Sequence, residues 1–276
     1  MTMLRSSTAD VFTPQDYGAL VNLAVQAQSV AARTATVVQT DKEKIGFKIW
    51  VSDPAVAHYN ENDTIAETDG DTDEVICIPS KTAGITSVSN ELVDDSDPAM
   101  DELIGKGLAN QIARAMDGAY LAQTTAKGPD GLLSVAYTSV DVPGGTLVNL
   151  DPFYEARFDA EAAGSQLTSW IVSHETAKAL TLLKKQTTGS NESLTDFVED
   201  GLTIAGLPVV RSNQVDADTL FWGIPKDHVM MVLRKDTRVE RFPNVHQDGV
   251  WLRAVARYGY AFLNEPGVVR DHNVTP

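Results

Sequence analysis

The most regular pattern of apolar residues lies between Pro98 and Thr124. Apolar side chains recur there at intervals of three and four residues, which places them on one face of an α-helix. Acidic residues precede the segment, where negative charge favours the helix dipole. Such a helix would be about 40 Å long at 1.5 Å per residue, so we expect it to act as a spine. The residues expected on its buried face are Met100, Leu103, Ile104, Leu108, Ile112, Ala115, Met116 and Ala119.

Two shorter segments, Ile45–Val51 and Glu74–Ser80, predict a pair of strands. The 22 residues between them make a connection far longer than an ordinary hairpin loop. This connection is too apolar for a solvated linker, and an isolated two-stranded ribbon is only marginally stable in water. We therefore expect the ribbon to reach onto a neighbouring molecule, which supplies the missing burial. The side chains expected to make this contact are Trp50, Val56, Tyr59 and Ile65.

The other segments predict a mixture of helices and strands, and hence an α+β fold. A helix is expected from Thr13 to Gln28, because a threonine cap precedes proline at the first helical position. Further helices are expected over residues 151–164 and 175–185, and residues 202–210 predict a turn that enters a strand. The other predicted strands are 35–39, 169–173, 221–223, 229–233, 238–242 and 250–262.

The last predicted strand carries two arginines on one face. Side chains alternate along a strand, so Arg253 and Arg257 point the same way. They could grip phosphate, but the acidic excess of the chain favours pairing with carboxylates at an interface. We expect Arg238 and Arg241 to take part in the same contacts, which would determine register more than affinity.

The overall charge argues against nucleic-acid recognition. The chain has 22 Lys and Arg against 38 Asp and Glu, a net charge of −16, so as a whole it gains no counterion-release energy on a phosphate backbone. No stretch approaches the roughly 18 uninterrupted apolar residues of a membrane span, and the first ten residues lack the apolar run of a secretory signal. We expect a chain that folds in a cytoplasm and binds no membrane.

No pattern of catalytic or metal-binding residues emerges. Cys77, the single cysteine, lies in an apolar strand and is expected to be a buried core side chain. The five histidines are dispersed without ligand spacing. The segment Asp69–Asp73 lacks the glycine and the glutamate that complete a calcium loop, and there is no Gly-x-Ser-x-Gly nucleophile motif. We therefore predict no catalytic residue, no cofactor and no metal.

Three carboxylates leave one enzymatic alternative open. Glu155, Asp159 and Glu161 lie on a predicted helix, where carboxylates usually form a solvated face. Two of them could instead form the acid–base pair of an acidic cytosolic hydrolase. A stable monomer with a deep pocket around these residues would favour that alternative, whereas the long ribbon argues against it.

Several short motifs follow one another in a recognisable order. They are Val88–Leu92 with Asp95 and Ser96, Ala113–Gln123, Gly128–Leu133, Trp170–Ser173, Ala205–Val209, Arg253–Arg257 and Ala261–Phe262. Each motif is weak alone, but in this order and spacing the chain resembles the major capsid proteins of tailed bacteriophages with the Hong Kong 97-type fold. The resemblance covers roughly residues 15–265.

The resemblance implies four parts. Residues 1–41 would form an N-terminal arm, and residues 42–82 an extended β-hairpin loop that lies over an adjacent subunit. Residues 83–134 together with 226–276 would form a peripheral domain, built on the long spine helix and a long sheet. Residues 135–225 would form an axial domain whose tips meet at the five- and six-fold axes.

The implied function is that of a virion protein. Pentamers and hexamers of one chain would form an icosahedral head shell that encloses double-stranded DNA without sequence-specific binding. Assembly would take place in the host bacterial cytoplasm, with a portal and possible scaffolding or decoration proteins as partners. Some relatives form Lys–Asn links, but no lysine occurs between Lys48 and Lys81, so we expect a shell without crosslinks. The closest alternative is an encapsulin-type nanocompartment shell protein, which would enclose a cargo enzyme.

Overall fold

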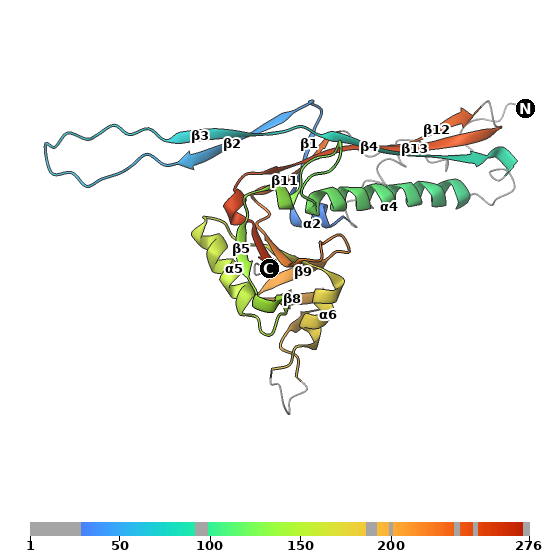
Figure 1. Ribbon diagram of the computed structural model, residues 1–276. Helices are drawn as coiled ribbons and strands as arrows, with labels where there is room; N and C mark the ends of the chain where they lie inside the picture. The colour runs from blue at the N-terminus through green and yellow to red at the C-terminus, as the bar shows by residue number, and fades with distance from the viewer. Residues whose placement is uncertain are drawn as a thin grey trace, which may run out of the picture.

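A computed structural model of the chain describes residues 29–91, 99–185, 192–198, 201–234, 238–244 and 248–272. Two β-sheets with their helices form the body of the molecule, and a two-stranded ribbon projects from one side of it (Figure 1). Helices and strands are both abundant, so the predicted α+β class is confirmed. The helix expected from Thr13 to Gln28 lies outside the described residues.

The first sheet has five strands and packs against a long helix, α4 (Figure 1). Strands β1, β11, β13 and β12 follow one another in that order, and β4 also pairs with β13. The strands are β1 (Thr36–Thr40), β4 (Ser80–Ser89), β11 (Val229–Arg234), β12 (Arg238–Asn244) and β13 (Gly249–Phe262). The four strands predicted from residue 35 to 39 and from residue 229 onward are confirmed to within two residues.

Helix α4 (Ala99–Leu121) is the predicted spine, and it is shorter than expected. Its 23 residues span about 35 Å at 1.5 Å per residue. Leu103 and Ala115 were predicted on its buried face, but both are exposed. Leu103 precedes the first fully buried position of the helix, and Ala115 lies one residue outside the buried stripe. That stripe consists of Ala109, Ile112, Ala113, Met116, Ala119 and Tyr120.

Two tyrosines of β13 attach the first sheet to α4. The hydroxyl of Tyr258 donates a hydrogen bond to the carbonyl oxygen of Ala115 (3.2 Å), and that of Tyr260 donates to Met116 (2.8 Å). Burial raises the pKa of Tyr260 well above its usual value. The Tyr260 hydroxyl therefore keeps its proton and remains a donor at neutral pH.

A short helix, α2 (Val30–Thr34), packs against α4. Asp117 of α4 accepts hydrogen bonds from the Ser29 hydroxyl (2.6 Å) and the Ala31 amide (3.1 Å), two donors at the beginning of α2. A carboxylate in this place satisfies amides that have no partner within the helix. The sequence did not predict α2, because five residues are too few for a periodic pattern.

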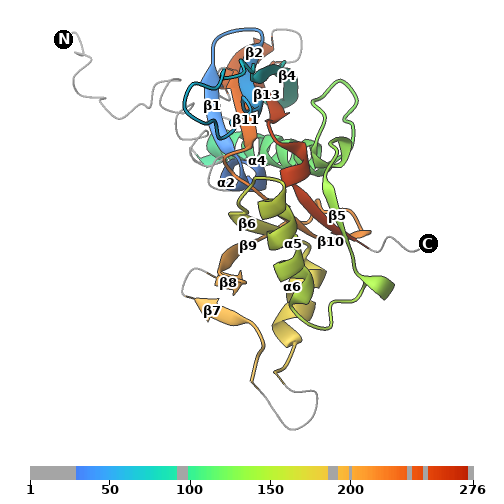
Figure 2. The same cartoon turned by 90° about the vertical axis from the view of Figure 1, so that its left-hand side faces the viewer.

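The second sheet has seven strands, in the order β5-β14-β10-β6-β9-β8-β7. Helices α5 (Asp151–Ala162) and α6 (His174–Leu182) pack on one of its faces, and the other face, with Ile171 and Trp222, joins the core that contains α4. The strands are β5 (Thr138–Asp141), β6 (Ser169–Val172), β7 (Asp196–Val198), β8 (Gly201–Ile204), β9 (Leu207–Arg211), β10 (Thr219–Ile224) and β14 (Val269–His272). Figure 2 shows this sheet with α5 and α6 below the first sheet and α4.

Two sequence-based boundaries need correction in the second sheet and its helices, and three strands were missed. The segment 202–210 holds two strands, β8 and β9, because Ala205 (φ 50°) and Gly206 (φ 79°) form a tight turn between them. Helix α6 ends at Leu182, three residues before the predicted end. Strands β5, β7 and β14 were not predicted, since each has only three or four residues.

Strand β14 lies second from one edge of the second sheet, where it pairs with β5 and β10. It therefore lies in a different sheet from β11, β12 and β13, and the assignment of residues 226–276 to a peripheral domain stays a prediction. The four residues of β14 include an arginine and an aspartate, so no apolar pattern indicated a buried strand. At the other end of the chain, β1 pairs in parallel with β11, so the segment expected as an arm contributes a strand to the first sheet.

Strands β2 (Ile45–Ser52) and β3 (Asp71–Cys77) pair antiparallel, and with residues 53–70 they form the ribbon. Both predicted strands are confirmed, but β3 begins three residues earlier than expected, which shortens the connection. The base of the ribbon packs on the first sheet, and its outer part projects away from the body (Figure 1). The packed residues are Ile45, Phe47, Val75 and Cys77 of the ribbon with Met230, Val232 and Ala261 of the sheet.

Candidate intersubunit surfaces

The outer part of the ribbon carries exposed apolar side chains. All four side chains predicted to make contacts are exposed there: Trp50 by 59%, Val56 by 96%, Tyr59 by 41% and Ile65 by 71%. Apolar groups gathered on a projecting segment mark an interaction site more reliably than single exposed residues do. The ribbon therefore has the kind of surface that binds another molecule, and its apolar side chains are left exposed in the single chain.

Local hydrogen bonds shape the loop at the end of the ribbon. The Tyr59 hydroxyl accepts a hydrogen bond from the Ala66 amide (3.1 Å), and the Thr68 hydroxyl donates one to the Ala55 carbonyl (2.9 Å). These bonds cross the loop from one side to the other. A loop that is ordered before it binds loses less conformational entropy when it binds.

The ribbon is also strongly acidic. No lysine or arginine occurs between Lys48 and Lys81, so nothing on the outer part balances its carboxylates. The acidic residues are Asp53, Glu61, Asp63, Glu67, Asp69, Asp71, Asp73 and Glu74. A surface that binds this ribbon must therefore supply cations together with apolar area.

One face of the first sheet lies against α4, and the ribbon base covers part of the opposite face, at Val232 and Ala261. The rest of that opposite face, here called the outer sheet face, has side chains that are exposed or half-buried. On this face, side chains of neighbouring strands lie side by side in register, such as Phe242 beside Trp251 and Trp251 beside Ser87. Two of its apolar side chains, Ile85 (59%) and Trp251 (41%), are well exposed. The outer sheet face consists of Lys81, Ala83, Ile85, Ser87, Arg238, Glu240, Phe242, Trp251, Arg253, Val255 and Arg257.

Cations dominate one end of the outer sheet face. Arg257 lies directly opposite Lys81, and neither makes an ion pair within the described residues. Like charges in directly opposed positions destabilise a sheet, so an acidic partner would stabilise this pair. Arg253 is different, because it pairs with Glu240 and lies over the ring of Phe242 at 4.9 Å.

The structure separates the four arginines that the sequence grouped together. Arg238, Arg253 and Arg257 share the outer sheet face. Arg241 lies opposite Leu252, and therefore on the other face of the sheet. Arg238 and Arg241 are three residues apart on one strand, so their side chains point to opposite faces. Arg241 is therefore not part of the outer sheet face, and its role in contacts between copies stays a prediction.

Sequence reasoning missed the apolar members of the outer sheet face. Ile85, Phe242 and Trp251 were not singled out, although a signal for them was present. In β13, apolar residues occupy both alternating sets, with Leu252 on the inner face and Trp251 on the outer one. A strand that is apolar on both faces needs cover on both, and within the described residues the outer side of β13 is covered by the ribbon base at Ala261 but left open at Trp251.

The thiol of Cys77 lies at the base of the ribbon and is buried, as predicted. Burial raises its pKa to about 11, and the reactive form of a cysteine is the thiolate. We expect maleimide to leave the folded chain unlabelled at pH 7.5 and to label it fully in denaturant, as measured by mass spectrometry. Fast labelling of the folded chain would mean that the ribbon base opens readily.

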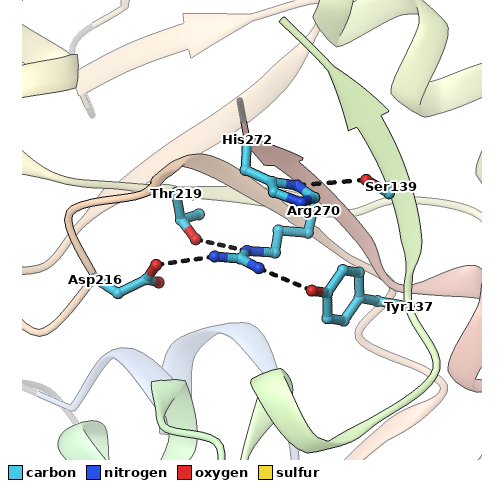
Figure 3. A network of polar contacts seen from close by, with 6 residues as sticks. All are labelled: Tyr137, Ser139, Asp216, Thr219, Arg270 and His272. Carbon is cyan, nitrogen blue, oxygen red and sulfur yellow. Dashed lines mark hydrogen bonds and ion pairs between the residues drawn. The ribbon is translucent and has the colours of Figure 1, made fainter. Parts of the chain in front are cut away.

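A buried arginine connects β14 to the segments beside it (Figure 3). Arg270 donates hydrogen bonds to the Thr219 hydroxyl (2.7 Å), the Tyr137 hydroxyl (2.8 Å) and an oxygen of Asp216 (2.9 Å). The guanidinium also lies over the rings of Tyr137 and Trp222, at 5.5 and 5.6 Å. Because all three nitrogens of its guanidinium donate hydrogen bonds within the protein, Arg270 stabilises the fold and is not available to a ligand.

The carboxylates of the enzymatic alternative form no site. Glu155, Asp159 and Glu161 are exposed on the solvent side of α5. Within the described ranges, no three His, Cys, Asp or Glu residues lie close enough to hold a metal ion. None of the helices in this part of the chain is long and apolar enough to cross a membrane.

The family model for the phage capsid family matches residues 9–270 of the 276-residue chain. The chain belongs to the phage capsid family. It is a major capsid protein, a structural component of the virion that assembles with copies of itself to form the icosahedral head shell. The match favours the phage capsid interpretation over the encapsulin and hydrolase alternatives. No curated protein matches the sequence.

Solved capsid structures share the fold at low sequence identity. A structure from Mycobacterium phage Adephagia is 15% identical with a TM-score of 0.76, and the match covers 100% of each chain. A structure from Mycobacterium phage Bobi is 16% identical with a TM-score of 0.74, over 90% of this capsid protein and 91% of that chain. The capsid of a native GTA particle is 18% identical with a TM-score of 0.73, over 90% and 91%. The mixed α+β fold of this capsid protein is therefore of the Hong Kong 97 type.

Proposed function

We propose that this capsid protein forms the head shell as pentamers and hexamers, and that its ribbon is the extended loop that binds an adjacent copy. The single observation that carries this proposal is the exposure of Val56 and Ile65 on an arm beyond the body. A ribbon with apolar side chains and no core of its own gains stability only when these side chains are buried on another molecule. The free energy gained is about 25 cal/mol per Å² of apolar surface buried.

The remaining parts follow from the two sheets. The first sheet with α4 corresponds to the peripheral domain, and the second sheet, now including β14, corresponds to the axial domain near the five- and six-fold axes. Residues before β1 correspond to the N-terminal arm. The proposed contact joins the ribbon of one copy to a different surface of the next copy, so it is heterologous. Contacts of this type form a closed shell when symmetry repeats them.

The outer sheet face of an adjacent copy is the surface that fits the ribbon best. It offers Ile85 and Trp251 as apolar partners, and Arg257 with Lys81 as cations without ion pairs. The ribbon offers Val56 and eight carboxylates without a single lysine or arginine. Complementary charge of this kind selects the partner and the register, while burial of the apolar groups supplies affinity.

The net charge supports a shell that encloses DNA without binding its sequence. A chain of charge −16 gains little from phosphate contacts, so packaged DNA would not be held by the wall. A portal and scaffolding or decoration proteins would complete the head. The absence of lysine between Lys48 and Lys81 supports a shell without Lys–Asn crosslinks.

Cysteine crosslinking between two variants tests the proposed docking. One chain carries Val56→Cys and the other carries Ile85→Cys, and the native Cys77 does not compete because it is buried. When the two chains are assembled together and treated with a short bismaleimide, we expect a covalent dimer on a denaturing gel. Each variant treated alone should give far less of it.

A matched control uses another exposed position in the second sheet's domain. Val148, 78% exposed, is replaced by cysteine and paired with Val56→Cys in the same way. Equal dimer yield from the Val148→Cys pair would contradict docking on the outer sheet face. A crosslink formed within one chain carrying both Val56→Cys and Ile85→Cys at high dilution would contradict contact between copies.

A further inference from the structure

Asp271 of β14 is a buried carboxyl group without a hydrogen-bond partner. Its side chain is 0% exposed, and neither oxygen is hydrogen-bonded within the described residues. Because side chains alternate along a strand, Asp271 shares its face with Val269 and not with Arg270 and His272. This is the face under α5, where Val269 packs in one core with Phe153.

The surroundings of Asp271 are apolar or negatively charged. Strand β10 places Phe221 opposite Asp271 and carries no charged residue, and β5 places Val140 opposite it. The charged groups that act on it are carboxylates, Asp141 of β5 and Glu155 of α5. Burial, followed by the charges of Asp141 and Glu155, raises the pKa of Asp271 to about 7.

We propose that the contact between α5 and β14 is a proton-sensitive joint. An ionised carboxylate without a partner is strongly disfavoured in an apolar contact, so α5 packs closely on the sheet only while Asp271 keeps its proton. When Asp271 loses that proton, repulsion from Asp141 and Glu155 adds to the cost of burial, and α5 separates from β14.

The joint bears on assembly because of what α5 carries on its exposed side. Tyr154 and Phe158, 47% and 69% exposed, lie one turn apart there. When α5 separates from the sheet, this aromatic pair moves with it. A change of pH toward 7 therefore displaces an exposed apolar surface of the kind that contacts between subunits bury.

The direction of the pH effect follows from the position of the pKa. An aspartate in an unfolded chain has a pKa of about 3.9. Between about pH 4 and pH 7, Asp271 is therefore protonated in the folded chain and ionised in the unfolded chain. The α5–β14 contact is therefore most stable in acid, loses stability between about pH 4 and pH 7, and changes little in stability above that range, where Asp271 is ionised in both states.

Hydrogen exchange of the full-length chain, kept unassembled at low concentration, tests the joint. We expect the protection of amides in α5 and β14 to fall about tenfold between pH 6 and pH 8, after correction for the intrinsic exchange rate. Asp271→Asn has a neutral side chain of the same size, so its protection should not change with pH. Amides of α4 should show no such change in either protein.

If Asp271→Asn fails to fold, substitutions at two exposed positions on α5 still test the proposal. Glu155→Gln removes one of the repelling charges and so lowers the pKa of Asp271, and the loss of protection should therefore be smaller and should level off at a lower pH. Asp159→Asn, on the same helix, should behave like the unmodified chain. A flat profile in the unmodified chain, or one unchanged by both Asp271→Asn and Glu155→Gln, would overturn the proposal. Because unassembled chains are used, a failure of the docking proposal would not affect this result.

Discussion

Shortening the ribbon is expected to abolish shell assembly while the subunit stays folded. In this variant an Asn-Gly pair replaces residues 50–72 and connects Ile49 to Asp73, which are partners in the β2–β3 register. Asn-Gly forms the tight turn that suits a two-residue hairpin. None of the removed residues belongs to a core formed by the described residues, so the free energy of unfolding should change by less than about 1 kcal/mol.

Assembly should respond differently, because every copy in the shell loses the contact that its ribbon makes. Electron microscopy and sedimentation should show at least a tenfold loss of closed shells, with unassembled subunits in their place. Circular dichroism with thermal unfolding would measure whether the subunits remain folded.

The control for this variant changes the loop without removing its contact surface. Asn62 has a positive φ of 72°, a conformation that glycine adopts without strain. Asn62→Gly should therefore assemble normally. Shells of normal number from the shortened chain would rule out the ribbon as an essential contact.

Replacing Arg270 with methionine is expected to lower the free energy of unfolding by about 3–5 kcal/mol, the usual loss when one partner of a buried ion pair is removed. The variant leaves Asp216, Tyr137 and Thr219 without the guanidinium that satisfies them. Among the described residues, one oxygen of Asp216 already has no hydrogen-bond partner. The substitution would also remove the ion pair that the other oxygen makes with Arg270. Denaturant unfolding of unassembled subunits would measure the change.

Two further variants separate the network from the charge alone. Arg270→Lys keeps the positive charge but cannot make three hydrogen bonds in a fixed plane, so it should lose an intermediate amount. Arg211→Met, at an exposed position on β9, should change stability by less than about 0.5 kcal/mol. If Arg270→Met were as stable as Arg211→Met, the network would contribute little to the second sheet.

The exposed ribbon and the buried arginine differ in how far the sequence revealed them. The ribbon was predictable because two strands and an apolar, acidic connection are adjacent in the chain. Arg270 was not, because its three partners belong to β10, the loop before β10 and the segment just before β5. The outer sheet face lies between these cases: alternation in β13 indicated that Arg253 and Arg257 share a face, but nothing placed Lys81 opposite Arg257.

The sequence by itself determined the spine helix, the ribbon strands, the acidic charge and the absence of any catalytic motif, since each depends on residues close together in the chain. Only the tertiary structure decided that β14 lies inside the second sheet, that Arg238 and not Arg241 shares a face with Arg253, and that Asp271 is buried beside two carboxylates. Periodicity shows which side chains of one strand share a face. Which distant strand lies beside it is decided by packing of the whole chain, and that pairing determines the charge and burial of each site.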